Sequence, residues 1–64
     1  MITFNMRKSD GTIIKGVAAE ADPLTQDFGY DYMIMVDNDE TGVHDFMYVS
    51  KDFFQRSDIE IVEE

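Results

Sequence analysis

The chain of 64 residues contains no cysteine, no tryptophan, one proline and one histidine. The absence of cysteine excludes a disulfide framework, a thiolate metal site and a cysteine nucleophile, and it fits a reducing compartment. Long hydrophobic runs are also missing. The longest uninterrupted apolar stretches, such as residues 33–36, are far below the ~20 residues that a membrane-spanning helix needs.

The first residues lack the basic start, the long apolar run and the small-residue cleavage site of a signal peptide. We therefore expect a soluble, cytoplasmic protein with no membrane partner. The hydrophobic fraction of 44% is ample for a folded core and argues against disorder. A chain of this length has room for one core, so residues 1–64 are predicted to form a single domain.

Basic residues are scarce, with 5 Lys and Arg against 14 Asp and Glu and a formal net charge of −9. Residues 22–64 hold 12 of the acids and only two of the bases. Such a surface repels phosphate backbones, because nucleic-acid binding depends on Lys and Arg. It attracts basic proteins instead. The alternative is that the acids only keep a small protein soluble.

The first 21 residues have the pattern of a β-hairpin. Ile2, Phe4 and Met6 alternate with polar residues, as in a half-buried strand. The three residues 9–11 end in Gly11, which suits a type I turn followed by a left-handed residue. A second strand then covers residue 12 to about residue 21. The predicted cross-strand pairs are Met6 with Ile14, Phe4 with Gly16 and Ile2 with Ala18.

The remaining residues predict three more strands. Asp22-Pro23 ends the second strand, and residues 24–29 form a loop anchored in the core by Leu24 and Phe28. Strands follow at residues 30–36 and 43–49, joined by a turn at 37–42 in which Val36 pairs with Val43. Residues 50–55 open with a good N-cap residue and predict one helical or 3₁₀ turn. Residues 58–62 alternate again and predict a fifth strand.

Five short strands with a single helical turn before the last one resemble a Src-homology-3-like small β-barrel. The resemblance implies a mainly β fold in which a five-stranded sheet closes on itself. The signalling members of that class open the third strand with tryptophan, which this chain does not contain, so binding of proline-rich peptides is not expected. The competing fold is a three- to five-stranded sheet with residues 50–56 packed on it as a helix.

Catalytic and metal-binding constellations are weak in this sequence. The single histidine, His44, is followed directly by Asp45, and adjacent strand residues point to opposite faces, so Asp45 cannot orient His44 as a triad acid would. Residues 37–42 copy the opening of a calcium loop, but its twelfth position is Tyr48 where a bidentate glutamate is needed. We therefore expect no enzyme, no cofactor and no specific metal site.

The third and fourth strands are apolar on both faces, whereas a sheet with one wet face is polar there. Three explanations compete. The strands curl so that a barrel covers both faces, which the pattern favours; or the second face is a dimer interface; or it docks a partner. That second face holds Asp31, Met33, Met35, His44, Phe46 and Tyr48. Asp45 falls on the core face. Of Phe53 and Phe54, one is predicted to plug the barrel end under the helical turn; the other either packs beneath the 22–29 loop or is exposed, and the core is favoured because paired aromatics are costly to leave in water.

Two functional hypotheses follow. The first is a non-enzymatic protein that presents an acidic surface to a basic protein partner, in its sharpest form an inhibitor that mimics nucleic acid, as small acidic proteins of bacteriophages and mobile elements do. The second is a structural or adaptor domain that homodimerises or docks through the Met/aromatic sheet face. The residues predicted to bind the partner in the first hypothesis are Tyr30, Asp31, Asp37, Asp39, Glu40, Asp45 and Tyr48.

Overall fold

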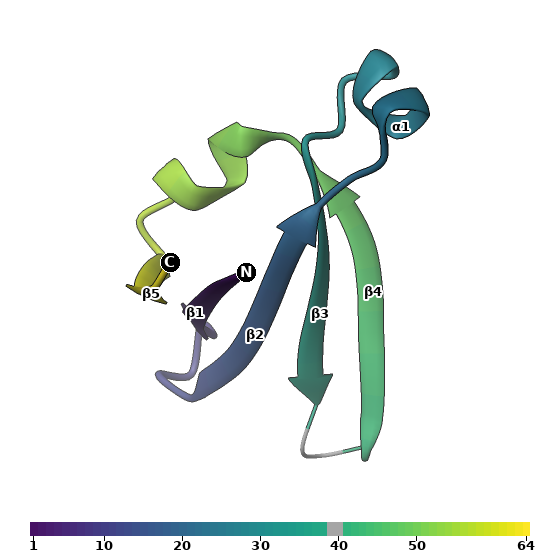
Figure 1. Ribbon diagram of the computed structural model, residues 1–64. Helices are drawn as coiled ribbons and strands as arrows, with labels where there is room; N and C mark the ends of the chain where they lie inside the picture. The colour runs from purple at the N-terminus through teal and green to yellow at the C-terminus, as the bar shows by residue number, and fades with distance from the viewer. Residues whose placement is uncertain (39–40) are drawn as a thin grey trace.

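The computed structural model describes residues 1–38 and 41–64, except for the side chains of Asn38 and Val43 (Figure 1). The fold is mainly β, and one 3₁₀ turn precedes the last strand, as predicted. In chain order the elements are β1 (Ile2–Arg7), β2 (Ile13–Glu20), α1 (Pro23–Asp27), β3 (Tyr32–Asn38), β4 (Val43–Val49), η1 (Lys51–Gln55) and β5 (Ile59–Glu63). No helix among the described residues is long and apolar enough to cross a bilayer.

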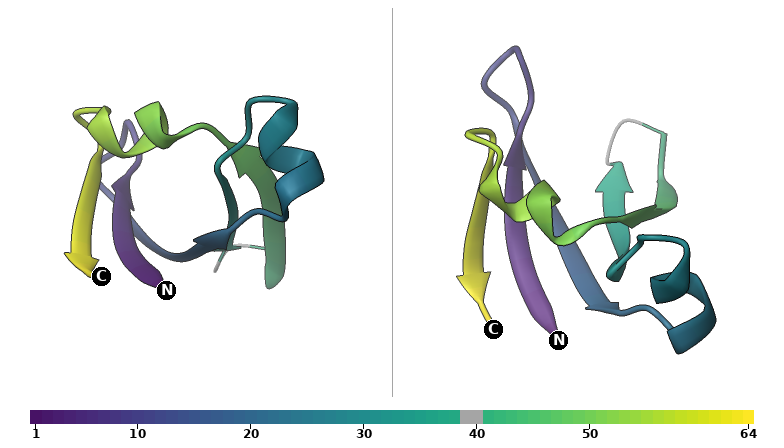
Figure 2. Two further views of the ribbon diagram at one scale, coloured as in Figure 1. Left: turned by 45° about the horizontal axis from the view of Figure 1, so that its top comes forward. Right: turned by 90° about the horizontal axis from the view of Figure 1, so that it is seen from above.

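All five strands belong to one antiparallel sheet in the order β4-β3-β2-β1-β5. The sheet is not closed into the predicted barrel, because β4 and β5 are its two edges in the part of the chain that the structure describes. The left view of Figure 2 shows the sheet curled into a trough, with the segment that contains η1 running from β4 across to β5. The fold is thus an open, curled sheet with a concave and a convex face.

The β1–β2 hairpin confirms the register that the sequence predicts. Phe4 pairs with Gly16, and the neighbouring pairs are Ile2 with Ala18 and Met6 with Ile14. Gly11 has a φ of 89°, the left-handed conformation expected at the end of this loop. Turn chemistry and hydrophobic alternation agree here, and that agreement fixes the register.

The β3–β4 hairpin differs from the prediction by two residues. Val36 pairs with Asp45, and Val43 pairs with Asn38, so the predicted pairing of Val36 with Val43 is wrong. The third strand begins at Tyr32 rather than at residue 30 and continues to Asn38. Because side chains alternate with a period of two, a shift of two residues moves the pairs along the strand and leaves the side chains of β3 and β4 that the structure describes on their predicted faces.

The segment between β2 and β3 contains the short helix α1, where the sequence predicted a loop. Asp22 is its N-cap, with Oδ1 accepting a hydrogen bond from the Thr25 backbone N–H (2.8 Å), and Pro23 occupies the first helical turn. Both residues are favoured at those positions. Leu24 and Phe28 are 69% and 75% exposed, so their predicted role as core anchors is wrong.

The hydrophobic core fills the concave face beneath η1. Phe4 is fully buried, and its ring makes edge-to-face contacts with Phe53 and Phe54 at centroid distances of 5.6 and 5.7 Å. Phe53 is buried and Phe54 packs against the core, which confirms the prediction for this pair. The seven residues of the buried cluster are Phe4, Ala18, Ile34, Val36, Val49, Phe53 and Ile59.

Candidate docking surface

The convex side of the sheet carries two adjacent apolar rows that run across β2, β3 and β4. The strand registers place three side chains in each row, because residues directly opposite each other share a face. Together the rows form a surface that we name the Met/aromatic face. Its six members are Val17, Met35 and Phe46 in one row and Ala19, Met33 and Tyr48 in the other.

The Met/aromatic face is open to solvent. Phe46 is 64% exposed, Tyr48 49% and Met33 39%, while the other three members are partly buried. The expectation that a barrel covers both faces of β3 and β4 is therefore wrong for the convex face. Since large exposed apolar patches on small proteins mark interaction sites more often than isolated apolar residues do, this face is the strongest candidate site on the described surface.

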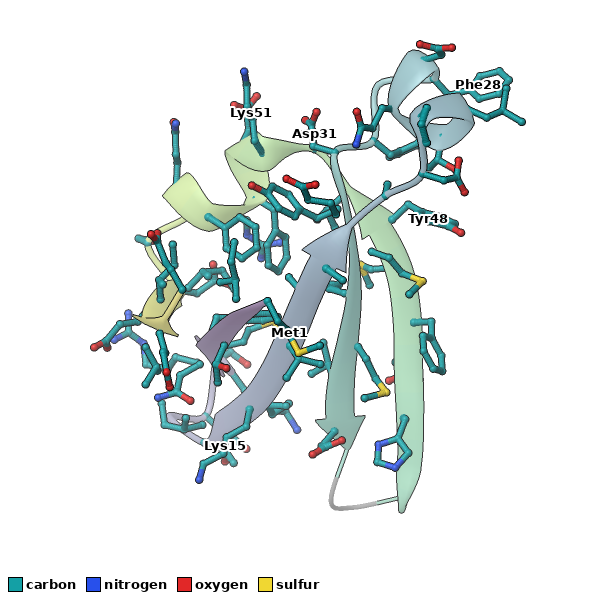
Figure 3. The ribbon with its side chains drawn as sticks, viewed as in Figure 1. Met1, Lys15, Phe28, Asp31, Tyr48 and Lys51 are labelled. Carbon is teal, nitrogen blue, oxygen red and sulfur yellow. The ribbon has the colours of Figure 1, made fainter. Side chains whose placement is uncertain are left out.

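Aromatic residues extend the face toward α1. The ring of Tyr30 lies 6.2 Å from that of Tyr48, centroid to centroid, and Tyr30 is itself exposed. Figure 3 shows Phe28, at the end of α1, and Tyr48, on β4, at the same end of the molecule. Leu24 and Phe28 are exposed on the same segment, whereas the sequence reasoning assigned them to the core.

Carboxylates border the Met/aromatic face along β3. Asp37 has the same strand parity as Met33 and Met35, so it lies next to Met35 on the convex side, whereas Asp31 precedes β3 at the opposite end of the rows. Oδ1 of Asp37 lies 2.5 Å from Nδ1 of His44, its cross-strand partner. Lys15 lines a hollow together with Met35 and Asp37, so this end of the face carries both signs of charge.

At the other end, Asp31 is held by a specific contact. Its Oδ2 accepts a hydrogen bond from the Lys51 backbone N–H at 2.9 Å, and Figure 3 shows both residues at the same end of the sheet. The bond satisfies a donor at the start of η1, where the N-cap residue Ser50 makes no side-chain capping bond. Asp31, directly before β3, thus connects that end of the strand to η1.

The structure brings together four of the seven residues predicted to bind a basic partner. Tyr30, Asp31, Asp37 and Tyr48 lie in or around the Met/aromatic face. Asp45 is exposed but pairs with Val36 on the concave side, so it points away from the other four. Asp39 and Glu40 lie outside the described residues.

The other described carboxylates are spread over the molecule, and several are engaged locally. Hydrogen bonds from Thr12 lower the pKa of Asp10, and the hydrogen bond from the Thr25 backbone lowers that of Asp22. Arg56 makes a two-pronged ion pair with Asp58, with N–O distances of 2.8 and 3.0 Å. Because acids lie on both faces and at both ends, charge by itself does not define one binding track on the described surface.

A metal site needs several carboxylate or imidazole ligands close together. Residues 1–38 and 41–64 contain no cluster of three or more His, Asp or Glu side chains placed to share one ion. The calcium-loop resemblance of residues 37–42 includes Asp39 and Glu40, which lie outside the described residues. The arrangement that remains is an apolar surface with a charged border, which suits recognition of another molecule. Comparison with protein-family models, curated proteins and solved structures finds no match for this chain.

Proposed function

We propose that this chain is a non-enzymatic protein-binding module that docks a partner protein through its Met/aromatic face. The observation that carries the proposal is the exposure of Met33, Phe46 and Tyr48 in two continuous apolar rows. Methionine and aromatic side chains are enriched at protein interfaces, and the unbranched methionine side chain adapts to the shape of a partner. Removing a face of this composition from water lowers the free energy and so favours binding.

The charge of the chain defines the kind of partner. Asp37 lies beside the apolar rows on the convex side, and the whole chain carries a formal charge of −9. A partner with an apolar centre and a rim of Lys and Arg matches this arrangement, because rim charges steer encounter and set orientation while apolar burial supplies affinity. The acidic character thus acts at long range, and the Met/aromatic face acts on contact.

The experiment begins with affinity capture from the native host and identification of the captured protein by mass spectrometry. Binding of that purified protein is then measured by calorimetry for the wild type and for Met33→Gln/Met35→Gln. We expect the double variant to lose at least about tenfold in affinity, because two apolar contacts are lost from the interface. Val62→Gln is the control, since Val62 is also an exposed apolar residue but lies on β5, at the opposite edge of the sheet.

Salt dependence separates this proposal from docking by charge alone. Apolar contacts are not screened, so measurable affinity should remain at about 1 M NaCl, where the Debye length is about 3 Å. If Met33→Gln/Met35→Gln binds like the wild type and high salt abolishes binding, the proposal fails. An acidic surface, including one that mimics nucleic acid, would then account for partner binding.

A further inference from the structure

Strand β4 is a free edge of the sheet. In the part of the chain that the structure describes, β3 is the only strand that pairs with β4. Its central side chains are exposed on both faces, with Phe46 and Tyr48 on the convex side and Asp45 and Met47 on the concave side. An edge strand of this kind offers unpaired backbone N–H and C=O groups to any further strand.

Proteins usually protect such edges with charged side chains, especially lysine, with proline or with a β-bulge. β4 has one such charge, Asp45, but neither lysine nor proline, and its register with β3 runs without a bulge. The opposite edge is different, because β5 carries Glu60 and Glu63 and its pairing with β1 is interrupted by a register shift. Of the two edges, only β4 combines a regular ladder with an apolar centre.

We propose that two copies of this chain pair through β4, antiparallel and about a two-fold axis at Phe46, to form a continuous ten-stranded sheet. This register uses the full length of β4. It sets Phe46 opposite Phe46 of the second copy and Asp45 opposite Met47 of the second copy. The inference stands on the edge strand and does not rest on the proposed function of the Met/aromatic face.

The sequence of β4 is self-complementary in this register. A two-fold interface requires that residue i meets residue j and that j meets i. Here an aromatic pair lies on the axis, and His44 meets Tyr48 on either side of it, which are favourable classes of cross-strand pair. The two Asp45 carboxylates do not face each other, as they would if the axis lay at Asp45.

The low charge of β4 also permits pairing with β4 of a second copy. Asp45 is the only acidic residue in β4, in a chain with 14 acids, so the edge is far less charged than the rest of the surface. A contact one strand wide buries less area than a stable complex needs. We therefore expect a weak dimer that dissociates on dilution.

A single introduced cysteine tests the register, because the chain has no cysteine of its own. In the proposed dimer the two copies of Phe46→Cys are directly opposite, with Cα atoms about 4.5–5.5 Å apart, within the range of a disulfide. His44→Cys is the matched control on the same face of β4. Its two copies are offset by four residues along the strand, roughly 13 Å, which is too far for a disulfide.

After mild oxidation at a concentration where sedimentation detects the wild-type dimer, we expect Phe46→Cys to form a covalent dimer and His44→Cys to remain monomeric on a non-reducing gel. Circular dichroism of both reduced variants checks that each is folded. Equal cross-linking of the two variants would overturn the proposed register. A wild-type chain that stays monomeric up to about 1 mM would overturn the dimer itself.

Charge substitution at Met47 provides a second test, since Met47 is 52% exposed and is placed opposite Asp45 of the second copy. Met47→Lys creates two opposite-charge pairs in each dimer, and Met47→Asp creates two like-charge pairs. We expect dissociation constants roughly tenfold apart, with Met47→Lys the tighter and Met47→Gln between them. If Lys and Asp weaken the dimer equally, the contact is nonspecific apolar association and the proposed pairing is wrong.

Different variants should disrupt partner binding and dimerisation, so the two proposals can be tested separately. Met33→Gln/Met35→Gln alters β3 and leaves the β4 edge intact, so it should weaken partner binding at least about tenfold without changing sedimentation. Met47→Asp has the reverse effect, because Met47 lies on the concave side of the sheet. A partner that binds the Met47→Asp monomer as tightly as the dimer would show that the Met/aromatic face works in one copy.

Discussion

At the scale of single residues, Gly16 packs directly against the ring of Phe4. A Cβ added at Gly16 would lie 2.4 Å from Cζ of Phe4, a ring that is fully buried. The ring cannot move away, because Phe53 and Phe54 contact it edge-to-face. Gly16→Ala should therefore lower the free energy of unfolding by about 1–3 kcal/mol, the usual cost of overpacking.

Urea unfolding of a double-mutant cycle checks this prediction. Phe4→Leu removes the ring that the new methyl group meets, so Phe4→Leu/Gly16→Ala should lose less stability than the two single variants added together. Gly11→Ala is the control, since Gly11 has open space around its Cα but a φ of +89°. Its strain of about 1–2 kcal/mol should add to that of Phe4→Leu without coupling. Additivity at Gly16 would contradict the steric explanation.

Asp22 should make part of the stability dependent on pH. Its pKa is lowered in the folded state by the hydrogen bond from the Thr25 backbone N–H. A depressed pKa means that the stabilising contribution is present above the unfolded value of 3.8 and is lost as pH falls through the folded value.

We therefore expect Asp22→Ala to be less stable than the wild type at pH 7, with a difference that shrinks below about pH 4. Urea midpoints across that range provide the measurement. Asp22→Asn keeps an oxygen acceptor for the Thr25 N–H and should retain much of the cap at pH 7. A difference between wild type and Asp22→Ala that stays constant from pH 7 to pH 2 would argue against a role for the charged carboxylate.

At the scale of elements, the two hairpins show how far sequence reasoning reaches. The register of β1–β2 was predictable, because the glycine turn and the apolar alternation each specify the same pairing. In β3–β4 the alternation specifies faces only, and the acidic residues at 37–42 suggested a longer turn than the structure has. The faces were therefore predicted correctly, and the pairs were displaced by two residues.

Helix α1 was missed although its signals were present. Asp22-Pro23 was interpreted only as the end of a strand, whereas the same two residues are the N-cap and the first turn of the helix. The exposure of the Met/aromatic face could not be predicted from the sequence, for a different reason. Apolar patterning shows that Met33 and Phe46 share a face, but only the extent of sheet closure decides whether that face meets solvent.

The junction between β3 and η1 gives a prediction at this scale. Asp31 was predicted to bind the partner, and the structure shows its carboxylate accepting the Lys51 backbone N–H. Asp31→Ala should lower the free energy of unfolding by about 1 kcal/mol, as loss of a helix cap does, while Asp31→Asn, which keeps an acceptor, should lose less than half of that. Urea unfolding compares the two. If both variants are as stable as the wild type, Asp31 contributes only charge to the border of the face.

At the scale of the whole molecule, net charge and dimensions act together. The molecule measures 35 × 24 × 19 Å and carries a formal charge of −9. At 0.01 M ionic strength the Debye length is about 30 Å, so a carboxylate at one end interacts with those at the other; at 1 M it is about 3 Å, and only neighbouring groups interact. Ionic strength should therefore change the free energy of every association that brings these charges closer together.

Ionic strength should shift the two proposed associations in opposite directions. Two copies that pair through β4 both carry a charge of −9, so raising NaCl from about 0.01 M to 1 M should tighten the dimer by screening their repulsion. The same change should weaken binding of a basic-rimmed partner, down to a plateau set by apolar burial on the Met/aromatic face. Sedimentation measures the first association and calorimetry the second.

The control for both salt titrations is the triple variant Glu60→Gln/Glu63→Gln/Glu64→Gln, which removes three negative charges from β5 and the C-terminus, at the sheet edge remote from β4. Because fewer charges are screened, its dimer should respond less steeply to NaCl than the wild-type dimer. A general effect of concentrated salt on apolar association would move wild type and variant equally. Two associations that both weaken with salt would contradict pairing of like-charged copies, since only attraction between opposite charges is lost in that way.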